Sequence, residues 1–167
     1  LPADAEHRRG VPQSKHPHFV LNSGRRAIGK IFPGFEDALI AEGGLLLMPS
    51  MDAAYGEKDG WAPRKSSTMT MVYSSRILIE RVMRDKVREL TNVKVIEGAT
   101  VTGLLTVAGG LESGRVTGAE YRDSSGDEHQ IEADLVVDCL GRGSSVNEWL
   151  AAAGWPEIPE HTLHAKV

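Results

Sequence analysis

The sequence has little cysteine, no long apolar run and no strong excess of charge, and each shortage excludes a class of protein. Its single cysteine, Cys139, cannot form an internal disulfide, so we expect a reducing, cytoplasmic setting. The longest run of large aliphatic residues outside residues 135–137 is residues 45–48, far shorter than a membrane span. The 23 acidic and 19 basic residues give a net charge of -4, which argues against nucleic acid as a partner.

Residues 131–145, I-E-A-D-L-V-V-D-C-L-G-R-G-S-S, carry the clearest local signal. The aliphatic run at 135–137 predicts a strand buried on both faces, and the glycines in 141–143 predict a tight turn. Ser145 followed by Glu148 fits a capping box at the start of a helix. Together these features direct free N–H groups at one point, which suits an anion such as a phosphate. Such turns also occur in α/β domains without a ligand, so these residues alone leave the ligand open.

The first part of the chain is predicted as a loop followed by two helices and two short strands. Residues 1–18 are punctuated by Pro and Gly and carry a basic cluster, which would lie either in solvent or along a phosphate. The predicted helices are 19–32 and 35–42, and the predicted strands are 45–48 and 69–73. Residues 45–73 resemble an excursion from the sheet that would wall a substrate site, and a long surface loop is the alternative.

Residues 75–90 are predicted as the strongest helix, with one apolar stripe formed by Ile79, Met83, Val87 and Leu90. Oppositely charged residues four apart are predicted to pair on its outer face: Glu80 with Arg84, and Arg81 with Asp85. Arg76 stands in the first turn, where a cation is unfavourable to the helix dipole. This placement indicates an anionic neighbour.

A short strand at 92–96 and an antiparallel three-stranded meander are predicted next. The meander occupies residues 99–132, with strands at 99–107, 115–122 and 128–131, and Gly103 and Gly118 are candidate bulge positions. It leads into the predicted buried strand, and Gly154 followed by Pro156 ends the last helix.

The histidines and acids do not indicate a metal site or a hydrolytic centre. His16-Pro17-His18 has a spacing found in metal sites, but no neighbouring pattern supplies a third ligand, so we predict no metal. The six histidines show no nucleophile–base spacing either, and we therefore name no catalytic residue.

Four local motifs, in this order, resemble the FAD-binding domain of flavoprotein monooxygenases of the glutathione-reductase-like type. These motifs are R-R-G-V-P-Q-S-K-H-P-H (8–18), P-G-F (33–35), S-R-I-L-I-E-R-V-M-R (75–84) and A-D-L-V-V-D-C-L-G-R-G-S (133–144). The group most similar is that of bacterial FAD-dependent oxidoreductases related to aromatic hydroxylases and flavin halogenases. The resemblance implies an α/β fold, an incomplete Rossmann-like FAD/NAD(P)-binding domain that includes the meander.

The resemblance also implies a role for each matching residue, with FAD as the cofactor. The loop from Arg9 to His18 would approach the flavin and its pyrophosphate, and Arg76 would contact a phosphate or ribose. Val101 would offer backbone groups to the adenine, and the glycine turn would let the backbone approach the dinucleotide. The cofactor-binding residues expected are Arg9, Gln13, His16, Arg76, Val101, Gly141, Arg142 and Gly143.

The sequence departs from the family in two places. Cys139 and Leu140 stand where Ala and Thr are usual, and aromatic hydroxylases would show Asp-Gly at positions 140–141, which argues against an NADPH-dependent hydroxylase. The chain also contains no G-x-G-x-x-G. We therefore expect residues 1–167 to be an internal fragment, a partial FAD-binding domain that is inactive alone.

The expected function is that of an FAD-dependent oxidoreductase, similar to flavin monooxygenases, acting on a small organic substrate. The flavin would carry out the redox chemistry, and NAD(P)H is a candidate electron donor. The alternatives are another NAD(P)-dependent α/β oxidoreductase and a non-catalytic binding domain that kept the fold. We expect no nucleic acid partner and no membrane span. The substrate, the reaction type and the oligomeric state stay open.

Overall fold

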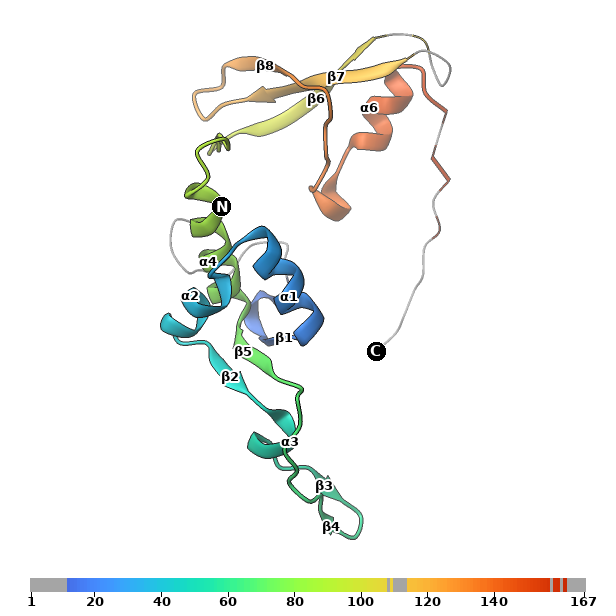
Figure 1. Ribbon diagram of the computed structural model, residues 1–167. Coiled ribbons are helices and arrows are strands. Elements are labelled where there is room, and N and C mark those ends of the chain that lie inside the picture. The colour runs from blue at the N-terminus through green and yellow to red at the C-terminus, as the bar shows by residue number, and fades with distance from the viewer. Residues whose placement is uncertain (1–11, 108, 110–113, 157, 160, 162–167) are drawn as a thin grey trace. The chain divides into compact units, whose positions relative to one another are not determined.

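The computed structural model describes residues 12–107, 109, 114–156, 158, 159 and 161, and Figure 1 shows the helices and strands that they form. The chain divides into two compact units, unit 1, Leu1–Val95, and unit 2, Ile96–Val167. Both contain a three-stranded antiparallel sheet and at least one helix, so the fold is mixed α/β. Among the described residues, no helix is both long enough and apolar enough to cross a membrane.

The sheet of unit 1 has the order β1-β5-β2, with β1 at Pro17–Val20, β5 at Met71–Ser75 and β2 at Leu45–Leu47. Phe19 and Leu45 lie opposite Tyr73 in the register, one on each side of the central strand. The predicted strands at 45–48 and 69–73 are confirmed, although β5 begins two residues later. The predicted start of a helix at residue 19 is wrong, because β1 pairs with a strand far along the chain, which local periodicity does not reveal.

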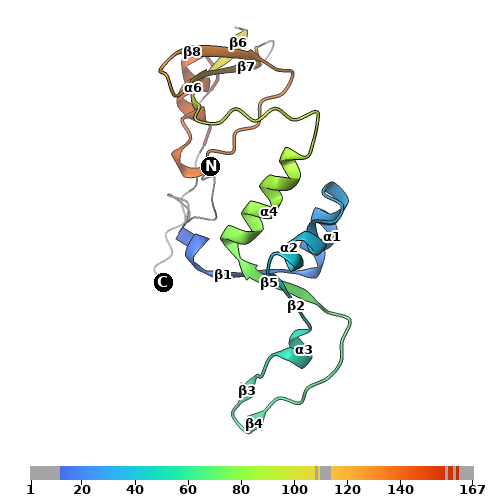
Figure 2. The same ribbon diagram turned by 90° about the vertical axis from the view of Figure 1, so that its left-hand side faces the viewer.

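Three helices follow the predicted order: α1 at Asn22–Ile31, α2 at Phe35–Ala41 and α4 at Arg76–Arg88. They lie on the opposite side of the sheet from the excursion that follows β2 (Figure 2). The buried core joins Phe35 and Leu39 of α2, Val72 of β5 and Val82 of α4. Ile79 and Met83 of the predicted apolar stripe pack against it, so this part of the stripe is confirmed. Leu90, its last predicted member, lies beyond the end of α4 and is 39% exposed.

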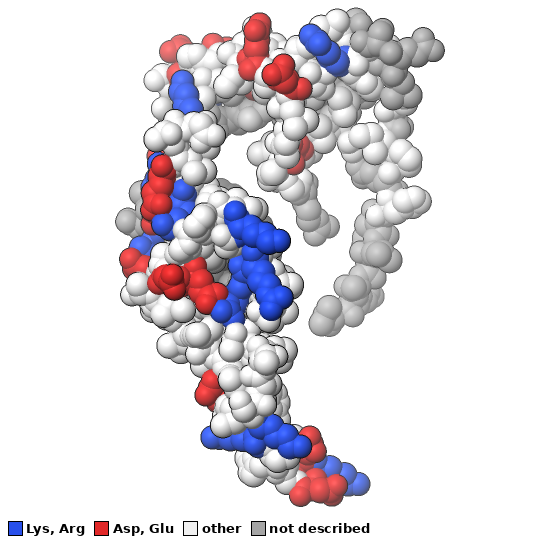
Figure 3. Space-filling model, in the orientation of Figure 1, with Lys and Arg blue, Asp and Glu red and all other residues white. Residues whose placement is uncertain are grey.

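A charged contact joins the first two helices of unit 1. Lys and Arg side chains gather over α1, beside acidic side chains (Figure 3). The guanidinium of Arg25 binds both carboxylate oxygens of Glu36 in the first turn of α2, and it also donates to Thr70 just before β5. The Glu36 carboxylate raises the pKa of Arg25, whose side chain is only 15% exposed. The Arg25 side chain therefore connects α1 to α2 and to the residue just before the central strand by hydrogen bonds.

Between β2 and β5 the chain leaves the sheet and returns, as predicted for an excursion. It contains α3 at Pro49–Asp52 and a small hairpin of β3, Gly56–Glu57, and β4, Gly60–Trp61. The excursion is closed at its base by the Ser50 and Ser67 hydroxyls, 3.0 Å apart. Trp61 near the tip of the hairpin is 76% exposed. The role of the excursion beside a substrate stays a prediction.

The sheet of unit 2 is the predicted meander. Its strands are β6 at Thr100–Val107, β7 at Arg115–Arg122 and β8 at Glu128–Glu132, in the order β6-β7-β8. The β6–β7 register shifts between Val101 and Gly103 and again between Leu105 and Thr106, opposite Gly118. Both predicted bulge positions are therefore confirmed, since each glycine adjoins a shift.

Two predicted strands do not form among the described residues. Residues 92–96 and 135–137 belong to no strand, and Leu135 and Val137 are 77% and 71% exposed. The prediction of a buried strand at 135–137 is therefore wrong for this structure. A strand needs a neighbour for its backbone groups, and neither described three-stranded sheet pairs with these residues. The last helix, α6 at Val146–Ala152, ends as predicted before Gly154, whose φ is +88°.

Candidate functional site

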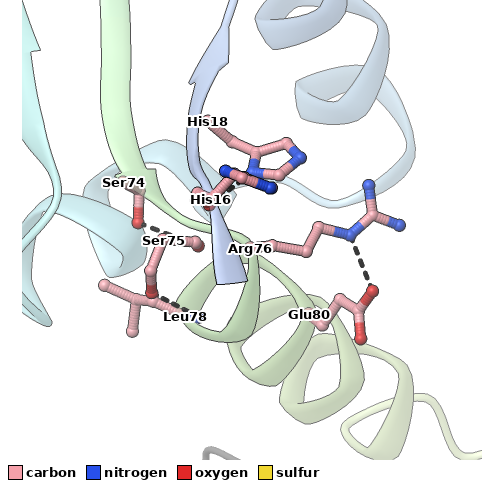
Figure 4. A network of polar contacts seen from close by, with 7 residues as sticks. All are labelled: His16, His18, Ser74, Ser75, Arg76, Leu78 and Glu80. Carbon is pink, nitrogen blue, oxygen red and sulfur yellow. Dashed lines mark hydrogen bonds and ion pairs between the residues drawn. The ribbon is translucent and has the colours of Figure 1, made fainter. Parts of the chain in front are cut away.

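The start of α4 places one predicted site residue, Arg76, beside an acid on its own helix. Ser75 caps the helix, its hydroxyl accepting the Leu78 N–H at 3.1 Å (Figure 4). Arg76 Nε donates to Glu80 Oε1 at 2.6 Å, and the two side chains are 41% and 21% exposed. The unfavourable placement of Arg76 is thus offset by Glu80, four residues on. A cofactor contact of Arg76 stays a prediction.

The predicted basic loop reaches the same place. A 3₁₀ turn, η1 at Pro12–Lys15, precedes β1, and the pairing of Pro17 with Ser75 brings His16 to the start of α4 (Figure 4). The Gln13 carbonyl accepts the His16 N–H at 3.1 Å, and the Gln13 side chain is exposed. Arg9 lies outside the described residues. The structure therefore brings together His16 and Arg76, which lie far apart in the sequence.

A pocket of about 400 Å³ adjoins this part of unit 1. Its lining combines the cationic side chain of Lys15 and the imidazole of His16 with apolar side chains such as that of Leu45. The hydroxyl of Ser14, a residue that is only 5% exposed, also belongs to the lining. No carboxylate is among these described lining residues, so the pocket can accept an anionic group without charge repulsion. No group of three or more His, Cys, Asp or Glu side chains in the described ranges could hold a metal ion.

In unit 2 the predicted glycine turn forms a 3₁₀ turn, η2, at Gly141–Gly143. Gly141 has a φ of +68°, a left-handed value that favours glycine, whereas Gly143 has no such φ. A Cβ at either position would meet no described atom within 4 Å. The surface of the turn is therefore open to a ligand. The side chain of Arg142 lies outside what the structure describes.

A clasp of side chains closes the segment that carries this turn. Asp138 Oδ1 accepts the Leu140 N–H at 2.8 Å, and Asp138 Oδ2 accepts the Ser144 hydroxyl. Ser144 Oγ in turn accepts the Val146 N–H at 3.0 Å. The Ser144 hydroxyl, and after it the Leu140 amide, lower the pKa of Asp138. We call this arrangement the Asp138–Ser144 clasp.

The clasp differs from the capping box that the sequence predicts. Ser145 makes no side-chain capping bond at the start of α6, so the predicted pairing of Ser145 with Glu148 is wrong. Ser144 provides a hydroxyl acceptor one residue earlier, because Asp138 orients it. The sequence signal for the clasp is an Asp before a glycine turn and a Ser after it, both of which readily bond to nearby backbone groups.

An apolar pocket of about 470 Å³ lies between the meander, the segment that leads into the glycine turn, and α6. Val101 of β6, which is 38% exposed, lines it together with Leu140, the residue before Gly141. Cys139 also lines the pocket and is exposed rather than buried in a strand. Of the predicted site residues, Val101 lines this pocket, and the glycine turn follows directly after the lining residue Leu140. The Asp138 carboxylate also lies in the lining.

Comparison with known proteins adds a similarity along the chain. No family model matches the sequence. The chain is 29% identical over 173 aligned positions to Protein Rv3254 of Mycobacterium tuberculosis (strain ATCC 25618 / H37Rv), and the alignment covers 98% of this chain and 35% of that protein. The chain thus spans about a third of the length of this relative, whose name describes no activity.

Proposed function

We propose that the chain is part of an FAD-dependent oxidoreductase, similar to flavin monooxygenases, that acts on a small organic molecule. The observation that carries the proposal is the apolar pocket of unit 2, which Val101 lines beside the open glycine turn. Its volume of about 470 Å³ lies within the range of small-molecule sites. An apolar slot next to an exposed glycine backbone suits an adenine ring followed by phosphate.

The residues present fit the chemistry of a dinucleotide. In unit 1, His16 and Lys15 line a pocket without a described carboxylate. Arg76 follows the lining residue Ser75, and its side chain is 41% exposed and bonded to Glu80. Cations in such a place would neutralise phosphate oxygens. In unit 2, Gly141 and Gly143 leave space for close approach to the backbone. FAD would supply the redox chemistry when bound, and the residues around the unit 2 pocket would bind and orient it.

An NAD(P)-dependent oxidoreductase is the second candidate, because an adenine pocket beside a glycine turn suits either dinucleotide. Visible absorbance of the intact protein separates the two, since flavin is yellow and nicotinamide cofactors are not. Intact protein that binds neither dinucleotide would instead favour a non-catalytic binding domain.

The decisive test of the turn is Gly143→Val in the intact protein. A Cβ at position 143 meets no described atom and the φ is ordinary, so the fold should persist. We expect the variant to lose bound flavin while its circular dichroism is unchanged. Gly29→Val on α1, which is equally open, is the matched control and should keep its flavin. A Gly143→Val protein with full flavin occupancy would remove the turn from the site.

A further inference from the structure

The segment that carries the glycine turn depends on a small set of local hydrogen bonds. Apart from the short turn η2, residues 138–145 belong to no helix or strand. Within this segment, Asp138 accepts one N–H and one O–H, Ser144 Oγ accepts the Val146 N–H, and the Ser144 N–H donates to the Gly141 carbonyl at 3.1 Å. These bonds connect the end of the aliphatic segment to the start of α6 across the turn.

Glycine makes this turn open, and it also makes the turn costly to order. Gly141 and Gly143 have more backbone freedom to lose than any other residue type. A ligand that had to order the turn on binding would lose that free energy from its affinity. A turn that is already held in place by its neighbours avoids the loss.

We infer that Asp138 and Ser144 are positioning residues, which hold the glycine turn in its ligand-binding conformation. The inference rests on the proposed function, since it assigns the turn to the cofactor. Asp138 directs both carboxylate oxygens at donors of its own segment, one at the Leu140 amide and one at the Ser144 hydroxyl. Each of its two carboxylate oxygens therefore accepts a hydrogen bond within the clasp. Ser144 links this carboxylate to the first residue of α6.

The variants that test the inference are Ser144→Ala, Ser144→Thr, Asp138→Ala and the double variant Asp138→Ala/Ser144→Ala, made in the intact protein. The controls are Ser145→Ala, whose side chain makes no capping bond, and Asp134→Ala, an exposed carboxylate four residues before Asp138. Two quantities are measured: the affinity of the flavin-free protein for FAD, and the hydrogen exchange of residues 138–146 without FAD.

Ser144→Ala removes both hydrogen bonds of the hydroxyl. We expect this variant to weaken FAD binding about threefold to tenfold and to speed amide exchange in the segment. Ser144→Thr keeps the hydroxyl and should restore both values. Because both residues act through one clasp, the double variant should lose no more affinity than the weaker-binding single variant. Ser145→Ala and Asp134→Ala should resemble the wild-type protein.

The outcomes separate this inference from the proposed function. Wild-type protein that binds no flavin refutes the proposed function, and the inference falls with it. Wild-type protein that binds flavin, together with a Ser144→Ala variant that exchanges faster and binds equally well, refutes the inference alone. Additive losses in the double variant also refute it, because they would mean that Asp138 and Ser144 act independently.

Discussion

Of the described glycines, Gly118 in the middle of the meander is the one where an added methyl group should lower the free energy of unfolding most. The residue is buried, and a Cβ there would lie 2.1 Å from the carbonyl oxygen of Ile131 on β8 and 2.8 Å from a methyl group of Leu105. Ordinary contact begins near 3.4 Å, so the β8 backbone would have to move by about 1.3 Å (3.4 - 2.1). Such a shift breaks the pairing of Gly118 with Glu132.

The expected loss of stability for Gly118→Ala follows from two costs. Overpacking costs about 1–3 kcal/mol, and each disturbed ladder hydrogen bond adds about 0.5–1.5 kcal/mol. The reduced freedom of the unfolded chain returns only about 0.4–1 kcal/mol. For one disturbed ladder hydrogen bond we therefore expect a net loss of about 0.5–4 kcal/mol.

Urea unfolding followed by circular dichroism measures this loss, and amide exchange locates it at the β7–β8 pairing. The matched control is Gly29→Ala on α1, where a Cβ meets no described atom within 4 Å. That variant should be more stable than the wild-type protein by about 0.5–1 kcal/mol, because alanine favours helix. A Gly118→Ala protein with the unfolding midpoint of the wild type would refute the reasoning.

Three further predictions concern charged groups. Arg76→Ala should weaken FAD binding by about tenfold to a hundredfold, and a titration with an unchanged affinity would remove Arg76 from the site. Glu36→Gln leaves the guanidinium of Arg25 with a weaker partner and should lower the free energy of unfolding by about 1–2 kcal/mol, measured by urea titration. The hydrogen bond from His129 lowers the pKa of Asp123, so its stabilisation is present above the ordinary carboxyl range and lost as the pH falls through the lowered pKa. The protection factors of amides at the β7–β8 turn, which correct for the slower intrinsic exchange in acid, should therefore fall at low pH, and Asp123→Asn should show a flatter pH dependence of protection.

Local patterns predict much of the fold, because some elements are determined by neighbours in the sequence. The stripe of α4 places Ile79 and Met83 on one face of a helix whatever lies elsewhere, and these residues do pack against the core. The meander is likewise local, since each strand pairs with the next. By contrast, β1 pairs with β5 across most of unit 1, and its short sequence at 17–20 has no distinctive alternation.

The candidate site is only partly predictable for a similar reason. The glycines in 141–143 and the apolar Val101 can be read from the sequence, but the pocket that joins them depends on how α6 folds back over the meander. The clasp between Asp138 and Ser144 depends on the turn between them having formed. For Leu135 the prediction fails in the opposite direction. The aliphatic segment around it predicts a buried strand, but a strand is buried only where neighbouring elements cover it, and Leu135 is exposed.

The reactivity of the exposed Cys139 thiol should depend on whether the apolar pocket is filled. It lines the pocket, and the chain contains one cysteine, so an alkylating reagent modifies one sulfur in these residues. A molecule that occupies the pocket would shield this sulfur and slow its alkylation by iodoacetamide. The rate of alkylation, measured by mass spectrometry over a series of candidate compounds, would then rank those compounds by occupancy, without a coloured cofactor or an assay of turnover.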